Sequence, residues 1–227
     1  MLKPKKKILR KEIKKDPVLE KISHAERYVR EKGKTLSYIL IAVVAVVVLA
    51  VLMIQSKQKA NREAAGDLGL AEMALAVGDV DNAIVQFEAL INTYPGTKNA
   101  GMATLLLASA YISKDDYENA EDYYRNYIED YAHEDLLVAA AYNGLGVCFE
   151  QKDDFRQAAE YFQMGGETSP FHFLQIQCFL NAARAYIEVG DYRQAESALA
   201  QIPTDQLGYD EKTEYEILNA KIEVLKD

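Results

Sequence analysis

The sequence has no tryptophan, only five prolines and only two cysteines among its 227 residues. Scarce proline, together with recurrent alanine, leucine and glutamate, favours helix over strand. The two cysteines, Cys148 and Cys178, belong to no CxxC pair and to no metal-binding spacing. We expect them to be small buried residues, since a disulfide between them would need an oxidising compartment and suitable geometry.

Catalytic motifs are also missing from the sequence. It contains no phosphate-binding loop, no GxSxG or HExxH motif and no cluster of metal ligands. The three histidines are scattered along the chain, at His24, His133 and His172. The last two fall near predicted turns, where solvated or helix-capping roles are expected. The sequence therefore predicts a protein that is not an enzyme and that uses no cofactor and no metal.

Positive charge is scarce outside the first 35 residues. Residues 1–35 carry 13 Lys/Arg and five Asp/Glu, whereas residues 55–227 carry 13 Lys/Arg and 30 Asp/Glu, a net charge of −17. This asymmetry indicates a membrane or polyanion at one end only. We interpret the lysine-rich tail as a topology signal that also attracts anionic lipid, at about 1 kcal/mol per charge. A ribosome contact is the alternative, but no aromatic or glycine motif supports it, and no nucleic-acid partner is expected.

One uncharged stretch, residues 36–54, is long enough to cross a membrane. Its 19 residues would form a helix of about 28 Å, close to the hydrocarbon thickness of a bilayer. A cleaved signal peptide is disfavoured by the 35 residues before the stretch and by the missing small-x-small cleavage site after it. Because only Lys57, Lys59 and Arg62 closely follow it, the positive-inside rule predicts a cytoplasmic tail at 1–35 and an exported C-terminal domain.

A repeat dominates the rest of the chain. Four segments share one pattern: GDVDNA at Gly78–Ala83, DDYENA at Asp115–Ala120, DDFRQA at Asp153–Ala158 and GDYRQA at Gly190–Ala195. Their final alanines are 37, 38 and 37 residues apart. Twelve residues before each alanine lies a small residue, namely Ala71, Ala108, Gly146 and Ala183, and thirteen before lie Leu70, Leu107, Leu145 and Ala182. Four residues after it lie Phe87, Tyr124, Phe162 and Leu199. Small residues where two helices cross, with large apolar residues between hairpins, are typical of stacked helical hairpins.

The acidic pairs in these turns, Asp115-Asp116 and Asp153-Asp154, are expected to cap helix N-termini rather than to perform acid–base chemistry.

The repeat pattern resembles the tetratricopeptide repeat in its small residue, aromatic residue and late alanine. The resemblance implies an all-α fold in which the transmembrane helix precedes a right-handed solenoid of helical hairpins. We expect a linker at residues 55–63, four repeats at 64–208 and a capping helix at 209–227.

In arrays of this type the first helix of each repeat lines a concave groove. The groove positions carried over from the resemblance are Leu68, Met102, Leu105, Ile112, Asn143, Val147, Leu180, Arg184 and Ile187. The Lys/Asn/Arg set of the carboxylate clamp found in chaperone-tail receptors is missing, so an apolar peptide or a partner helix fits better. The alternative is that these residues pack on one another or on the capping helix.

The whole architecture resembles the bacterial ancillary translocon-subunit family. The resemblance includes the lead into the anchor, residues 25–36 (AERYVREKGKTL). It implies a single-pass inner-membrane protein with a periplasmic repeat domain, and translocon subunits, periplasmic chaperones or newly exported chains as partners. Two alternatives stay open. The turn at 94–100 (YPGTKNA) looks like that of envelope scaffolds for outer-membrane assembly or division, and the opposite orientation would give an organelle import receptor.

Overall fold

The computed structural model describes residues 17–132 and 134–226, so the first 16 residues of the basic tail, His133 and Asp227 lie outside the described residues. The chain divides into two compact units, Met1–Ser56 and Lys57–Asp227. The described helices are α1 (Pro17–Ala76), α2 (Val80–Thr93), α3 (Lys98–Ile112), α4 (Tyr117–Asp130), α5 (Asp135–Gln151), α6 (Phe155–Thr168), α7 (His172–Glu188), α8 (Tyr192–Ala200), the 3-10 turn η1 (Thr204–Gln206) and α9 (Tyr209–Lys226). The prediction of an all-α chain is confirmed.

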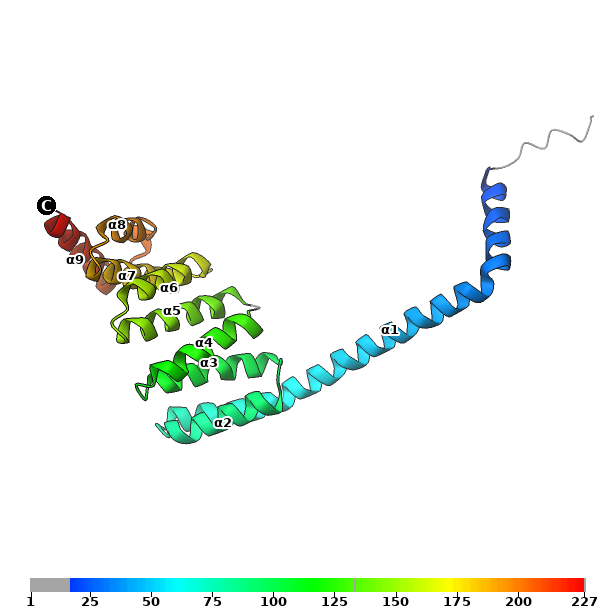
Figure 1. The fold of residues 1–227 in the computed structure, drawn as a ribbon, viewed down its shortest axis with the longest axis horizontal. Coiled ribbons are helices and arrows are strands. Elements are labelled where there is room, and N and C mark those ends of the chain that lie inside the picture. Colours follow the sequence, from blue (N-terminus) through cyan, green and yellow to red (C-terminus); the bar gives the residue numbers. More distant parts are fainter. Residues whose placement is uncertain (1–16, 133, 227) are drawn as a thin grey trace, which may run out of the picture. The chain divides into compact units, whose positions relative to one another are not determined.

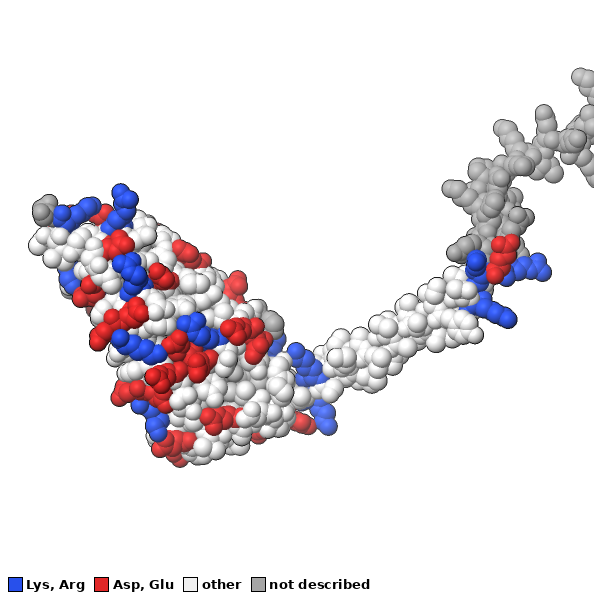
Figure 2. Space-filling model, viewed as in Figure 1, with Lys and Arg blue, Asp and Glu red and all other residues white. Residues whose placement is uncertain are grey.

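Helix α1 contains the predicted membrane segment. By length and composition it is the one helix among the described residues that could cross a membrane, and its apolar window is not buried within the chain. Every side chain of 38–54 is exposed, and Figure 2 shows this stretch as an uninterrupted white surface. A core helix of a soluble domain would instead be buried against other parts of the chain. Residues 55–63, expected as a linker, are part of the same helix.

The second unit is a stack of helical hairpins (Figure 1). Each hairpin turn follows the predicted pattern, and its first residue has a left-handed backbone: Gly78 (φ 82°), Asp115 (φ 58°), Asp153 (φ 60°) and Gly190 (φ 73°). Glycine and aspartate are among the few residues that adopt this conformation at low cost. The aspartate that follows accepts a hydrogen bond from the backbone N–H three residues on, as Asp116 does from Asn119 at 3.2 Å. These side chains cap α2, α4, α6 and α8, as predicted.

Helix crossings inside the repeats follow the predicted alternation of small and large residues. The small residues twelve positions before each repeat alanine are all buried, and so are the large residues four positions after it, namely Phe87, Tyr124, Phe162 and Leu199. At the third repeat the crossing leaves no room for a side chain, because a Cβ added to Gly146 would lie 2.4 Å from the Phe162 ring. The small side chains therefore set how near the two helices of a hairpin approach.

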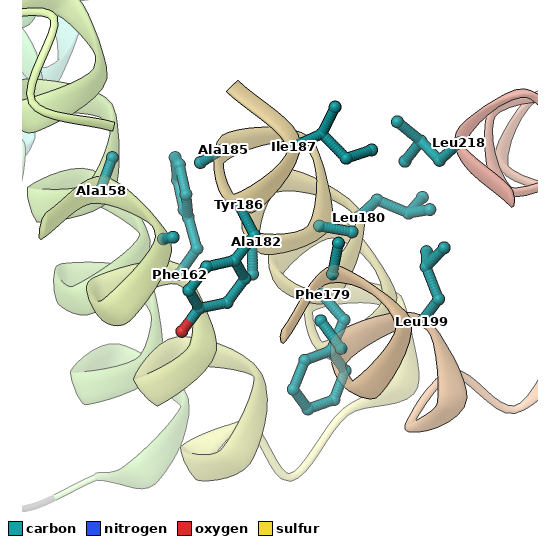
Figure 3. Close-up of a cluster of buried hydrophobic side chains, with 14 of the residues drawn as sticks. Ala158, Phe162, Phe179, Leu180, Ala182, Ala185, Tyr186, Ile187, Leu199 and Leu218 are labelled. Atoms are coloured by element: carbon teal, nitrogen blue, oxygen red, sulfur yellow. The ribbon is translucent and has the colours of Figure 1, made fainter. Parts of the chain in front are cut away.

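The core runs through the stack as neighbouring clusters rather than as one centre. Figure 3 shows the last cluster, which joins Phe162 of α6 and Leu199 of α8 through Tyr186 and Phe179 of α7, the helix that lies between them. Leu218 of α9 closes it, so the predicted capping role for this helix is physically plausible. The C-terminal part of α9 is tied to α7 by the ion pair Lys221–Glu188 and to α8 by the ion pair Lys226–Glu196, at 3.0 and 2.7 Å.

Both cysteines are free and buried. Cys148 packs in the cluster between α3 and α5, whereas Cys178 lies in a separate small cluster with Ala139 and Leu174. Burial raises the pKa of the Cys148 thiol to about 11 and that of Cys178 to about 12. The thiols therefore stay protonated at neutral pH, which makes them unreactive.

Candidate partner-binding surface

The first helices of the repeats form a continuous side of the stack. Helix α3 contacts α5, α5 contacts α7, and α7 contacts α9, in addition to the contacts inside each hairpin. We call the side formed by the solvent-facing residues of these odd-numbered helices the inner surface. It is where first helices of neighbouring repeats meet, so a ligand lying along it could touch several repeats at once.

Nine residues were predicted to line a groove on this side, and the structure divides them into two groups. Leu68, Leu105, Leu180 and Ile187 are buried, whereas Met102, Ile112, Asn143, Val147 and Arg184 are half-buried. The buried four are core residues: Leu180 and Ile187, for example, pack in the cluster that Leu218 of α9 completes. The side chains that reach solvent are therefore mainly the half-buried group and its neighbours.

Polar side chains cross the inner surface as a ladder of hydrogen bonds. The Asn143 Oδ1 atom accepts from Asn181 Nδ2 at 3.3 Å and from Cys178 Sγ at 3.5 Å. Arg184 Nη1 donates to Asn181 Oδ1 at 3.3 Å, and the same guanidinium forms an ion pair with Glu214. The ladder thus joins α5, α7 and α9. Each side chain is held in place by its neighbour, which pre-organises the polar part of this surface.

Beside the ladder, a hollow of about 170 Å³ opens between α7 and α9. It is lined by Phe173, Gln177, Leu180, Asn181, Glu211 and Glu214. Phe173 is 70% exposed, so its apolar ring faces solvent at the edge of the hollow. An apolar side chain beside Phe173 and a basic group near Glu211 and Glu214 would both find complementary chemistry here.

Sequence reasoning identified Leu180 and Arg184 but missed most of this hollow. Phe173, Gln177, Asn181 and Arg184 follow one another at intervals of four, four and three residues. That helical stripe was visible in the sequence. Glu211 and Glu214 could not be found in this way, because they belong to α9 and reach the hollow only through tertiary packing.

A compact charge cluster elsewhere joins α4 to the end of α5. Glu121 accepts hydrogen bonds from Arg125 Nε at 2.9 Å and from Lys152 Nζ at 2.6 Å. The Arg125 guanidinium also lies 5.5 Å from the centre of the Tyr161 ring. Burial alone would raise the pKa of Glu121, but the hydrogen bonds from Lys152 and Arg125 outweigh it, and the pKa is lowered. All these groups are satisfied by one another, so the loss of one partner would leave a partly buried charge uncompensated.

Comparison with known proteins identifies the repeated unit. A tetratricopeptide-repeat family model matches residues 63–97, and a second model of the same repeat matches residues 100–165. These segments are tetratricopeptide repeats. The matches include the first three hairpin turns, where the capping aspartates and left-handed residues lie. The prediction of this repeat type is confirmed there.

Solved structures show the same fold at low sequence identity. BtubC from P. vanneervenii is 19% identical with a TM-score of 0.53, over 68% of this chain and 62% of that one, so the chain spans less than two thirds of its length. One MamA crystal structure is 20% identical (TM-score 0.52, 70% and 81% covered), and another is 14% identical (TM-score 0.55, 72% and 91% covered). A search of curated protein sequences found no match. Likeness at this level concerns the fold alone.

Tetratricopeptide repeats indicate a protein–protein interaction module, and the comparisons point to no enzyme family. Within residues 17–132 and 134–226, no group of three or more His, Cys, Asp or Glu side chains is placed to hold a metal ion. At the hollow, the inner surface presents an apolar ring, Phe173, beside the carboxylates of Glu211 and Glu214.

Proposed function

We propose that the chain is a docking module that a single membrane helix holds at the bacterial inner membrane, with its repeats in the periplasm. It would bind chaperones or newly exported polypeptides beside the Sec translocon. The observation that supports this most directly is the pairing, in one chain, of interaction repeats with a helix long and apolar enough to span a bilayer. Anchoring raises the effective concentration of the repeats for anything that emerges nearby.

Two electrostatic features support the proposed orientation and partner. The excess of basic residues before the membrane segment favours retention of the N-terminal tail in the cytoplasm. The repeat domain carries a net charge of −17 over residues 55–227, which repels anionic lipid and keeps its surfaces available to proteins. In Figure 2 acidic side chains are spread over the visible face of the domain among fewer basic ones.

The hollow between α7 and α9 is the best-formed part of the proposed docking surface. An extended or helical segment of an exported protein combines apolar side chains with scattered lysine and arginine. Phe173 offers the apolar contact, and Glu211 and Glu214 offer partners for a cation. Side chains of the hydrogen-bonded ladder, which hold one another in place, supply amide groups at fixed positions beside the hollow.

Site-specific photo-crosslinking in living cells tests the proposal. A crosslinker at Gln177 should trap translocon subunits, chaperones or nascent exported chains, whereas one at Gln194, an exposed glutamine on α8, serves as the matched control. Adducts from Gln194 alone would place the binding surface elsewhere. Recovery of outer-membrane assembly or division proteins from Gln177 would instead favour the envelope-scaffold alternative.

Two substitutions should separate the apolar contribution to partner binding from the electrostatic one. Phe173→Ala removes the exposed ring, and we expect it to weaken crosslinking at Gln177 without lowering the melting temperature, because the ring makes little contact with the core. Glu214→Gln removes the charge that Arg184 pairs with and should reduce capture of basic clients more than of neutral ones. Equal capture by all variants would contradict this assignment of the site.

A further inference from the structure

The first hairpin keeps apolar residues at positions that the later repeats bury. Leu70 is 60% exposed, whereas its counterparts Leu107, Leu145 and Ala182 are at most 1% exposed. Met73 is 66% exposed, whereas its counterparts Ala110, Cys148 and Ala185 are all fully buried. In the later repeats the preceding hairpin covers these positions. The first hairpin therefore presents a repeat–repeat interface that no other described residue covers.

This face includes a groove of about 520 Å³ between α1 and α2. One wall is formed by Leu70 and Met73 of α1 and by Val77 just after it, and the α2 wall by uncharged residues such as Asn82 and Gln86. Asp67 and Asp79 also line the groove. All of these residues belong to the repeat domain. The groove is open and apolar on one side, which suits the packing of another helix along α1.

The sequence of α1 along this face has the spacing of a coiled-coil seam. The residues Lys59, Glu63, Gly66, Leu70, Met73 and Val77 follow one another at alternating intervals of four and three. An average interval of 3.5 residues between such positions keeps them on the side of α1 that would face a partner helix. Gly66 costs helix stability relative to alanine. A Cβ there would meet nothing within 4 Å, so packing inside the described chain gives no reason for a glycine, whereas close approach of a partner helix does.

The charged residues beside the seam of one chain are complementary to the same residues of a second copy. Arg62 and Asp67 lie five residues apart on opposite flanks of the seam, and both are exposed. When two copies of α1 pair in parallel and in register, Arg62 of each copy faces Asp67 of the other. Lys59 and Glu63, which are 3.8 Å apart within one helix, would each face the same residue of the other copy, so the apolar part of the seam begins after them. An unrelated partner would have no reason to match this arrangement.

We propose that the occupant of this face is a second copy of the chain, which forms a parallel two-fold dimer along the end of α1, from Arg62 to the Val77 that follows the helix. A two-fold interface of this kind closes on itself and adds no further copies. The parallel direction rests on the membrane anchor of the proposed function, because two chains anchored in the same way enter one membrane side by side. The inner surface stays free in both copies, so dimerisation would double the number of docking sites.

Disulfide crosslinking of the full-length chain in its native membrane tests the geometry. In a parallel two-fold pair, a seam residue meets the same residue of the other copy. Gly66→Cys and Met73→Cys should therefore give disulfide-linked dimers on oxidation. Glu72→Cys, exposed on the far side of the same helix, is the matched control and should give few. Cys148 and Cys178 do not interfere, because both are buried. Equal yields at all three positions, no dimers at all, or adducts only with another protein would overturn the proposal.

Exchanging the charges of Arg62 and Asp67 tests the two-fold symmetry of the proposed dimer. The dimer dissociation constant is measured by sedimentation equilibrium of the purified full-length chain in detergent. Arg62→Asp and Asp67→Arg should each raise the dimer dissociation constant by on the order of tenfold, since each dimer has two such pairs. The double variant should return to the wild-type value. Leu70→Asp should abolish the dimer while leaving the melting temperature of the repeats unchanged, because that side chain is exposed. A monomeric wild type, or a double variant weaker than both single ones, would refute the pairing. Neither result would affect partner crosslinking at Gln177, which tests the proposed function separately.

Discussion

Replacing Gly146 by alanine tests whether the helix crossing in the third repeat is as tight as the structure shows. The added Cβ would lie 2.4 and 2.5 Å from two carbon atoms of the Phe162 ring. Ordinary contact needs about 3.5–4.0 Å, so the ring has to move by about 1 Å. Phe162 is fully buried and has no free space to enter. Overpacking of this kind costs about 1–3 kcal/mol.

A compensating gain reduces the expected effect. Alanine is favoured over glycine in a helix by about 0.5–1 kcal/mol, which leaves a net loss of about 1–2 kcal/mol. For a domain of this size each kcal/mol lowers the melting temperature by about 2–4 °C. The matched control is Gly69→Ala in α1, where a Cβ would meet nothing within 4 Å. That variant should be more stable than wild type by the helix-propensity gain alone.

The assay is urea unfolding of the fragment that begins at Lys57, followed by circular dichroism. The order of stability should be Gly69→Ala, wild type, Gly146→Ala. Shortening the opposing ring with Phe162→Leu should make the Gly146→Ala change less costly in a double-mutant cycle. The packing argument fails if Gly146→Ala is as stable as wild type, or if Gly69→Ala loses as much stability as Gly146→Ala.

Three further predictions concern topology, thiols and pH. A membrane-impermeant thiol reagent applied to outer-membrane-permeabilised cells should label a cysteine placed at Ser56 but not one placed at Lys15, and the reverse pattern would overturn the periplasmic orientation. Cys148 and Cys178 should resist alkylation in the folded chain and react only on unfolding; rapid modification of either without loss of helicity would contradict their burial. Because the folded pKa of Glu121 lies below its ordinary 4.5, its contribution to stability is present above that pH and is lost as the pH falls below it. Glu121→Gln should therefore flatten the acid side of the stability profile, and a profile parallel to that of wild type would show that the charge cluster contributes nothing.

The sequence was informative wherever the physics is local. A left-handed turn residue, a capping aspartate and a small residue at a helix crossing each depend on neighbours within one hairpin. For this reason the capping roles of Asp116 and Asp154 and the small residue Gly146 were predicted correctly. Asp115 and Asp153 were expected to cap as well, but they take the left-handed turn position instead. The uncharged segment 36–54 was equally visible, since its signal is composition and length alone.

Exposure along the first helices depended on what packs against each of them. Leu70 and Leu107 occupy the same position in the repeat, yet only Leu107 has a preceding hairpin to cover it. Leu180, predicted as a groove residue, lines the hollow but is itself buried, because α9 folds back onto α7. Equivalent sequence positions thus became core in one repeat and surface in another.

The sequence by itself determined the repeat, its hairpin turns and the candidate membrane helix, since each is encoded within a few tens of residues. Only the tertiary structure decided which apolar side chains remain exposed and which polar ones meet. Asn143 and Glu214 belong to one ladder, although three helices lie between α5 and α9 in the chain. Stacking brings such residues together because each hairpin must bury its apolar face against the next.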